Sequence, residues 1–138
     1  MSPALLAVGV AIAGSLGAIA RYALDTGLSA WLADRARARS GGRGRTSDLP
    51  WATLLVNVSG SLLLGAVAGL SARHGLPHDA LASVGVGFCG GYTTFSAASV
   101  GAVTLVRDRR YLAAAGYALG TLALSVAAAA LGVWAVSR

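Results

Sequence analysis

The side chains of this chain that are equipped for chemistry are uncharged, and they lie within long apolar segments. A glycine-rich stretch, residues 85–99, contains two threonines and two serines, and Asn57 lies in the apolar segment before it. Tyr117, Thr121 and Ser125 follow at four-residue steps, which places them on one face of a helix. Hydroxyl and amide groups in this pattern predict hydrogen bonding to an ion or between helices.

The stretch 85–99 predicts a helix that is interrupted inside a membrane. Its glycines, at positions 85, 87, 90 and 91, precede the pair Thr93 and Thr94, and glycine weakens a helix interior. At membrane depth, unwound backbone is tolerated only where protein buries it or where it lines a polar cavity. Such breaks mark ion and substrate sites, because freed carbonyls can hold a cation and the next helix N-terminus attracts an anion.

The composition places these groups in a membrane protein. The chain has 138 residues, of which 56% are hydrophobic and 12% are charged. This balance excludes an ordinary soluble domain. The net charge is +6, and every one of the basic residues is an arginine. The arginines cluster between apolar segments, which indicates membrane topology rather than nucleic-acid binding.

The apolar segments predict an all-α membrane protein with one domain that covers residues 1–138. We expect four transmembrane helices, each close to the roughly 20 residues that a bilayer requires, at residues 4–22, 50–72, 80–106 and 111–136. The third helix is the one expected to break in mid-membrane. Residues 34–48, rich in Arg, Gly and Ser, are expected to form a flexible loop.

The acidic residues are all expected at helix ends or in loops: Asp25, Asp34, Asp48, Asp79 and Asp108. Proton-coupled and organic-cation transporters usually need a carboxylate within the membrane. This expectation argues against a small multidrug-type exporter. Paired carboxylates, metal-ligand clusters and Ser-His-Asp arrangements are also missing from the sequence, so we predict that the chain is not an enzyme.

Each intramembrane polar residue has a structural and a functional interpretation. A serine or threonine can bond back to its own helix or bridge two helices. Asn57 cannot satisfy its amide within its own helix, and an unpaired amide in lipid is costly. Arg21 either snorkels and pairs with Asp25, or supplies a fixed charge that attracts anions to a vestibule.

The motifs of the chain resemble those of the Fluc (CrcB) family of fluoride channels over nearly its whole length. Residues 17–22, GAIARY, are similar to the family's GAxxRY. Residues 53–61, TLLVNVSGS, with Gly65 beyond them, resemble TLxVNxxGS…G. Residues 87–96, GFCGGYTTFS, match GfxGGxTTFS, and this is the most specific of the three motifs. The fourth-helix pattern is carried by Tyr117, Thr121 and Gly132.

The resemblance implies an antiparallel, dual-topology-type dimer with two pores along its interface. It also implies a structural sodium ion on the dimer axis, which is not transported and is held by the backbone carbonyls of Gly90 and Thr93. A hard cation prefers oxygen ligands, so such a site suits the predicted break.

The same resemblance implies a fluoride pathway with Arg21 in its vestibule. The pathway residues are Asn57, Thr94, Phe95, Ser96, Ser99, Tyr117, Thr121 and Ser125. The family uses two phenylalanines whose positive ring edges face the anion. Phe95 matches the first, and Ala98 stands where the second is expected.

These observations predict a passive fluoride channel that exports the toxic anion from the cytoplasm. Fluoride enters cells as the neutral acid and dissociates inside, so a pore suffices without energy coupling. Two alternatives remain: a small multidrug-type exporter, and a non-conducting subunit of a heterodimeric membrane complex.

The arginines predict the location and the partner of the chain. We expect a multi-pass protein of the inner (plasma) membrane with both termini outside, because one set of loops carries most of the arginines: Arg35, Arg37, Arg39, Arg43, Arg45, Arg107, Arg109 and Arg110, against Arg73 and Arg138. Such a bias fixes one orientation and favours an antiparallel heterodimer with a second channel subunit, which would also supply the ring missing at Ala98. A homodimer that inserts both ways is the alternative.

Overall fold

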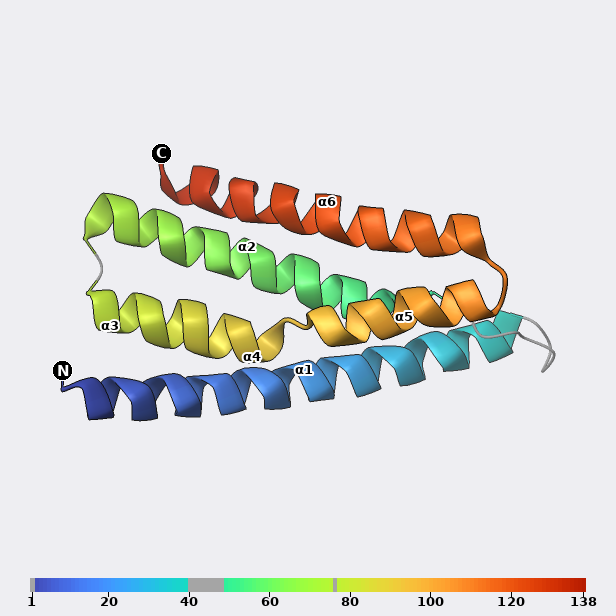
Figure 1. The fold of residues 1–138 in the computed structure, drawn as a ribbon, viewed down its shortest axis with the longest axis horizontal. Coiled ribbons are helices and arrows are strands. Elements are labelled where there is room, and N and C mark those ends of the chain that lie inside the picture. The colour runs from blue at the N-terminus through green and yellow to red at the C-terminus, as the bar shows by residue number, and fades with distance from the viewer. Residues whose placement is uncertain (1, 40–48, 76) are drawn as a thin grey trace.

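The computed structural model describes residues 2–39, 49–75 and 77–138. Within these ranges the chain forms helices and no strand, so the predicted all-α class is confirmed (Figure 1). The elements are α1 (Pro3–Arg39), α2 (Trp51–His74), α3 (His78–Ala80), the π-helix η1 (Leu81–Cys89), α4 (Gly90–Tyr92), α5 (Phe95–Arg107) and α6 (Tyr111–Val136).

Three of the described helices are long and apolar enough to cross a membrane. They are Pro3–Arg35 within α1, Trp51–Arg73 within α2, and Tyr111–Val136, which is the whole of α6. The predicted bounds of the second and fourth helices, 50–72 and 111–136, match α2 and α6 closely. The segment between α2 and α6 runs beside these helices as shorter pieces placed end to end (Figure 1).

Helix α1 is much longer than the predicted 4–22. It has 37 residues, which corresponds to about 55 Å, well beyond the hydrocarbon core of about 30 Å. Its second half is rich in Ala, Leu and Arg, which favour helix, and contains no proline. The helix therefore continues into the predicted loop, of which residues 40–48 lie outside the described residues. The expectation that no acidic residue falls inside a long helix is wrong for Asp25 and Asp34.

The predicted break in the third segment is confirmed, but its position differs from the expectation. The helical path runs from α3 to the end of α5, and it is interrupted at two residues. Thr93 has φ −79° and ψ 161°, and Thr94 has φ −151° and ψ 114°, both extended. Gly90 is helical, with φ −64° and ψ −38°. The threonines, and not the glycines before them, leave the helix.

Two glycines of this segment, Gly87 and Gly91, allow close packing against α1. A Cβ added to Gly91 would collide with the carbonyl of Gly14, and one added to Gly87 would lie 2.8 Å from the carbonyl oxygen of Val10. Glycine at these positions lets two backbones approach, as small residues do at membrane helix interfaces. The first half of the broken segment is therefore held against α1.

A second close contact joins α2 to α6, which lie side by side in Figure 1. A Cβ on Gly65 would collide with the carbonyl of Ala129, and one on Gly132 would collide with the carbonyl of Leu62. By contrast, a Cβ on Gly116 or Gly120 meets no described atom within 4 Å. Gly65 and Gly132 thus let the backbones of α2 and α6 approach each other, whereas Gly116 and Gly120 make no such contact with the described atoms.

Both termini lie at one end of the bundle, and the end of α1 lies with the α5–α6 turn at the other (Figure 1). Few apolar side chains of the single chain are buried; one cluster joins Leu105, Ala114 and Tyr117. Large apolar side chains are exposed on every long helix. Such a surface fits lipid rather than water.

Candidate functional site

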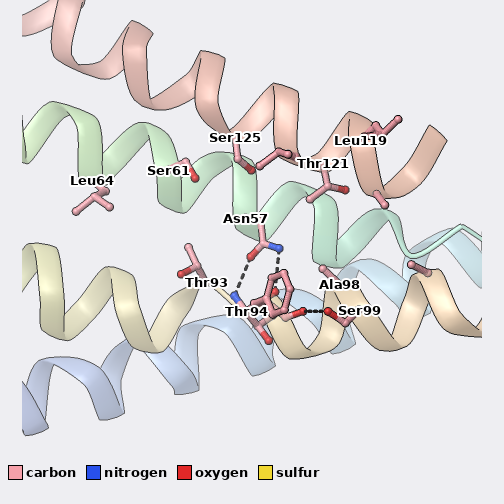
Figure 2. A pocket seen from close by; sticks show the side chains of 14 residues that line it. Asn57, Ser61, Leu64, Thr93, Thr94, Ala98, Ser99, Leu119, Thr121 and Ser125 are labelled. Atoms are coloured by element: carbon pink, nitrogen blue, oxygen red, sulfur yellow. Dashed lines mark hydrogen bonds between the residues drawn. The ribbon is translucent and has the colours of Figure 1, made fainter. Parts of the chain in front are cut away.

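The amide of Asn57 forms two hydrogen bonds with the backbone of Thr94 at the helix break. The N–H of Thr94 donates to Asn57 Oδ1 at 2.8 Å, and Asn57 Nδ2 donates to the carbonyl of Thr94 at 3.0 Å (Figure 2). Asn57 is buried on α2. The side chain therefore pairs with the backbone as another peptide group would. These two bonds satisfy the buried amide, which would be costly if it were left unpaired.

This pairing removes a donor from the carbonyl of Gly90. In a continuous α-helix, the N–H of Thr94 would donate to that carbonyl four residues earlier. Since this N–H is bonded to Asn57 instead, the carbonyl of Gly90 loses its intrahelical partner. The first half of the broken segment consequently ends with an oxygen available to another donor or to a cation.

The carbonyl of Thr93 loses its donor in a similar way. Its intrahelical partner would be the N–H of Ala97, which instead donates to Thr94 Oγ1 at 3.1 Å. Thr94 is thus the N-cap of α5, a position that threonine occupies readily. The two carbonyls predicted to bind sodium are therefore both deprived of their helical donors by side chains, and this donor set fits a hard cation.

Further hydrogen bonds hold the residues before the break. Thr93 donates from its backbone N–H and from Oγ1 to the carbonyl of Cys89, at 2.9 and 2.8 Å. The hydroxyls of Ser59 and Tyr92 are 3.0 Å apart and link α2 to α4, and the ring of Tyr92 stacks on Phe88. The interrupted backbone is in this way fixed on both sides of Thr93.

A groove of about 520 Å³ opens beside the break, between α2, α5 and α6 (Figure 2). Its walls are mostly apolar, and we call it the polar groove because hydroxyl and amide groups also line it. Its polar lining is uncharged. The residues that line it are Asn57, Ser61, Leu64, Thr93, Thr94, Phe95, Ala98, Ser99, Ala102, Ala118, Leu119, Thr121, Leu122 and Ser125. Six of the eight predicted pathway residues meet here, drawn from three helices.

The hydroxyls of the groove differ in what they can donate. Ser99 donates to the carbonyl of Phe95 at 2.9 Å, and Thr121 donates to that of Tyr117 at 2.7 Å. A hydroxyl has one proton, so these two are engaged with their own helices. Ser125 Oγ, in contrast, is a buried oxygen without a partner among the described atoms. Ser125 therefore has a proton to offer a ligand.

Two of the predicted pathway residues and the predicted vestibule residue lie outside this groove. Ser96 is exposed and does not line it. Tyr117 is buried in the apolar cluster with Leu105, although its hydroxyl, like that of Ser125, is buried without a partner among the described atoms. Arg21 lines a neighbouring cavity of about 140 Å³.

That neighbouring cavity shares Thr94 with the groove and also contains Asp25. Arg21 and Asp25 lie one helical turn apart on α1, but these two described side chains do not form the ion pair that their spacing predicts. Because Thr94 lines both spaces, the cavity that contains Arg21 adjoins the groove at this residue.

Sequence reasoning did not assign two features of the site. Ser61 lines the groove, and its place one helical turn after Asn57 was the available signal. The pairing of Asn57 with the backbone of Thr94 had no signal, because the two residues are 37 positions apart in the chain.

The side chain of Phe95, expected to present its ring to an anion, projects away from its own subunit. It is 89% exposed, more than almost any other large apolar side chain described. Ala98, one turn further along α5, lines the groove in the place of the second expected ring. The chain therefore provides one ring at this site, and the described residues leave it largely uncovered.

Together, the fold and the site define a helical membrane protein whose interrupted helix borders an uncharged polar groove. Residues 8–133 match the family described as CrcB-like protein, Camphor Resistance (CrcB). The chain belongs to this family.

Several curated relatives are named as fluoride-specific ion channels. The chain is 45% identical to the fluoride-specific ion channel FluC 1 of Leifsonia xyli subsp. xyli, over 97% of this chain and 88% of the relative. It is 41% identical to FluC of Nitrobacter winogradskyi, over 90% and 89%. It is 35% identical to FluC 2 of Mycobacterium tuberculosis, over 92% and 87%. These relatives are channels rather than enzymes.

Proposed function

We propose that this chain is a subunit of a fluoride-specific ion channel that lets fluoride leave the cytoplasm passively. The observation that carries the proposal is the uncharged polar groove beside the helix break, in a chain that belongs to the CrcB family. The names of the relatives supply the identity of the ion. In this reading the pieces from α3 to α5 cross the membrane together as a fourth, interrupted span.

The groove has the chemistry that a small anion needs. Its described lining contains no carboxylate that would repel an anion, and Ser125 has a hydroxyl proton to donate. The N-terminus of α5 at Phe95 carries the positive end of a helix dipole. Arg21, in the adjoining cavity, adds a positive charge that would attract anions toward the entrance.

A structural sodium ion fits the same break. The carbonyls of Gly90 and Thr93, deprived of their helical donors, would hold it together with the matching carbonyls of a second subunit. Such an ion would supply a fixed positive charge that binds the two breaks to each other. Among the described residues no group of His, Cys, Asp or Glu gathers as a metal site, so backbone oxygen is the ligand that this chain offers.

The exposed ring of Phe95 supports a second subunit. A phenylalanine on the rim of a polar groove needs a covering surface, and an antiparallel subunit would place the break of its own third span opposite. Ala98 lines the groove where a second phenylalanine is expected, so this chain supplies only one ring of the pair at this site. A partner with a phenylalanine at the matching position would complete the pair of rings, which favours a heterodimer over a homodimer.

The arginines favour insertion of this chain in a single orientation. The exposed Arg35 and Arg37 of α1, together with Arg107 and Arg109 near the α5–α6 turn, lie at the end of the bundle away from the termini (Figure 1). Cytoplasmic loops carry an excess of Arg and Lys. The termini would then face outward from the inner membrane, and a partner of opposite bias would insert the other way.

Two other functions remain as outcomes to test. An exporter of the small multidrug type would need a carboxylate in its substrate path. Asp25 borders the cavity of Arg21 and another cavity between α1 and the start of α2, but not the groove. A non-conducting subunit is the stronger alternative, because Ala98 leaves this chain with one ring.

Fluoride efflux from liposomes separates these functions. We expect passive efflux of fluoride and none of chloride from vesicles that contain the chain with its partner subunit. Efflux that depends on a proton gradient or on an organic cation would indicate an exporter. Crosslinking of the purified chain alone shows whether it forms a dimer by itself, and strong fluoride efflux from an antiparallel dimer of this one chain would rule out the need for a partner.

A further inference from the structure

We propose that the side chains of Asn57 and Thr94 set the affinity of the helix break for sodium, because they hold the two backbone N–H groups that would otherwise occupy the carbonyls of Gly90 and Thr93. The inference rests on the proposed function only in that sodium is the cation at the break. It makes Asn57 a positioning residue for the cation as well as a lining residue of the anion groove.

Asn57 keeps the carbonyl of Gly90 open, because its Oδ1 accepts a hydrogen bond of 2.8 Å from the N–H of Thr94. If the acceptor on Asn57 were removed, that N–H would have to find another partner in a poorly hydrated site. The carbonyl of Gly90 is the partner that helical geometry supplies, four residues earlier. A carbonyl that accepts this bond has a positive hydrogen beside it, which repels a cation.

Thr94 Oγ1 acts on the other carbonyl, that of Thr93, independently of the Asn57 side chain. This oxygen accepts the N–H of Ala97 at 3.1 Å, and its removal would return that N–H to the carbonyl of Thr93. Asn57 and Thr94 belong to different elements, and they divert different donors from different carbonyls. The same loss of sodium affinity is therefore expected from two changes that share no atom.

The other hydrogen bond of Asn57, from Nδ2 to the carbonyl of Thr94 at 3.0 Å, allows the two roles of this residue to be separated. In Asn57→Asp a carboxyl oxygen still accepts the N–H of Thr94, so the break is kept open for a cation. The amide donor is lost and negative charge is added beside the groove. We expect this variant to retain sodium binding while fluoride efflux falls.

The Ser59–Tyr92 bond provides a matched control. It joins the same helix, α2, to the same broken segment through hydroxyls 3.0 Å apart, but it holds no N–H that could reach either carbonyl. Tyr92→Phe removes this bond and leaves the ring in place to stack on Phe88. If Asn57 only held the two segments together, Tyr92→Phe would have the same effect as a change at Asn57. If Asn57 positions the break for a cation, Tyr92→Phe would leave the sodium affinity unchanged.

The experiment measures the melting temperature of the purified dimer, formed as the crosslinking above defines, against sodium concentration. N-methylglucamine replaces sodium at constant ionic strength. A ligand that binds only the folded state adds stability as the logarithm of 1 + L/Kd, where L is the ligand concentration, so the rise of the melting temperature with sodium yields the dissociation constant. We call the sodium concentration equal to this constant the sodium midpoint. The variants are Asn57→Leu, Thr94→Val, Thr94→Ser, Asn57→Asp and Tyr92→Phe.

Sodium should stabilise the unmodified protein. Asn57→Leu and Thr94→Val should each move the sodium midpoint upward by about tenfold or more, which is the size of effect that partners of metal ligands usually have. Thr94→Ser, which keeps the capping oxygen, should restore the unmodified midpoint. Tyr92→Phe should lower the melting temperature at every sodium concentration without moving the midpoint.

The proposal is overturned if Asn57→Leu and Thr94→Val show the midpoint of Tyr92→Phe, or if sodium does not stabilise the unmodified dimer. If one variant fails to fold, the other decides, since the two act on separate carbonyls. The proposed function is tested separately by fluoride efflux. A dimer that releases no fluoride but melts as described would keep this inference and remove the channel, and the opposite result would do the reverse.

Discussion

At the scale of single residues, the groove is defined by which polar groups are already bonded. Ser99 and Thr121 donate to carbonyls of their own helices, whereas Ser125 Oγ is buried with no partner among the described atoms. An anion would accept hydrogen bonds from donors, so the unbonded hydroxyl would contribute more than the bonded ones. A position on the groove wall therefore does not by itself indicate how strongly a hydroxyl would bind an anion.

The first prediction therefore compares two serines of similar position. Ser125→Ala should reduce fluoride efflux about tenfold, because it removes a donor that could only be replaced by water, at a cost near 1–3 kcal/mol. Ser99→Ala should change efflux by less than about twofold, since it removes a hydroxyl that is engaged with its own helix. Equal losses in the two variants, measured in liposomes, would show that the hydroxyls rotate freely.

The second prediction concerns Phe95. Phe95→Leu should keep the melting temperature of the subunit within about 2 °C, because an exposed substitution away from special contacts costs little. Fluoride efflux should nevertheless fall strongly, since leucine lacks the polarised ring edge. Phe95→Tyr, which keeps the ring edge, serves as the control. Unimpaired efflux of Phe95→Leu would remove this residue from the pathway.

At the scale of elements, the broken segment is held by its neighbours on both sides. Its first half packs against α1 through glycines such as Gly91, and its break is bonded to α2 through Asn57. The interruption is thus a property of the contact between elements. Helix α6 takes little part in the break, and it packs mainly on α2, through Gly65 and Gly132.

The third prediction tests this pairing of α2 with α6. Gly65→Ala should lower the melting temperature clearly, because the added methyl group collides with the backbone at Ala129, and overpacking of this kind costs about 1–3 kcal/mol or more. Gly116→Ala, on the open face of α6, should leave the melting temperature of the subunit unchanged or slightly raised, since alanine favours helix. A similar loss in both variants would mean that α6 packs on other elements than α2.

At the scale of the whole molecule, the chain has the features of one part of a larger assembly. The apolar cluster around Leu105 is small, and many large apolar side chains are exposed, Phe95 most notably. In a bilayer, lipid covers such side chains, but it offers no partner to carbonyls left open at a helix break. The second subunit proposed above would satisfy both requirements at once.

The fourth prediction concerns orientation. A cysteine at Ser137, introduced with Cys89 changed to alanine, should react with a membrane-impermeant reagent added to intact cells. Cys89 itself is buried, so its replacement removes a background thiol without opening the surface. A cysteine at Arg109, at the opposite end of the bundle (Figure 1), should be protected. Labelling of both sites would indicate that the chain inserts in two orientations.

The sequence by itself determined the class of protein, the bounds of α2 and α6, and the presence of a break within residues 85–99. These features are local: long apolar runs give spanning helices, and helix-weakening residues give an interruption. The motifs also identified the family, and six of the residues predicted for the pathway line one groove. The end of α1 was placed too early, because the Arg-rich stretch that suggested a loop also consists of good helix formers.

Only the tertiary structure decided where the backbone unwinds and which oxygens it frees. Glycine permits unwinding but does not require it: Gly90 remains helical, and Gly87 and Gly91 pack closely against α1. The chain leaves the helix at Thr94 because Asn57, 37 positions away, supplies the acceptor for its N–H. Hydrogen bonds between distant elements cannot be read from spacing along the chain, since they depend on which surfaces the packing brings together.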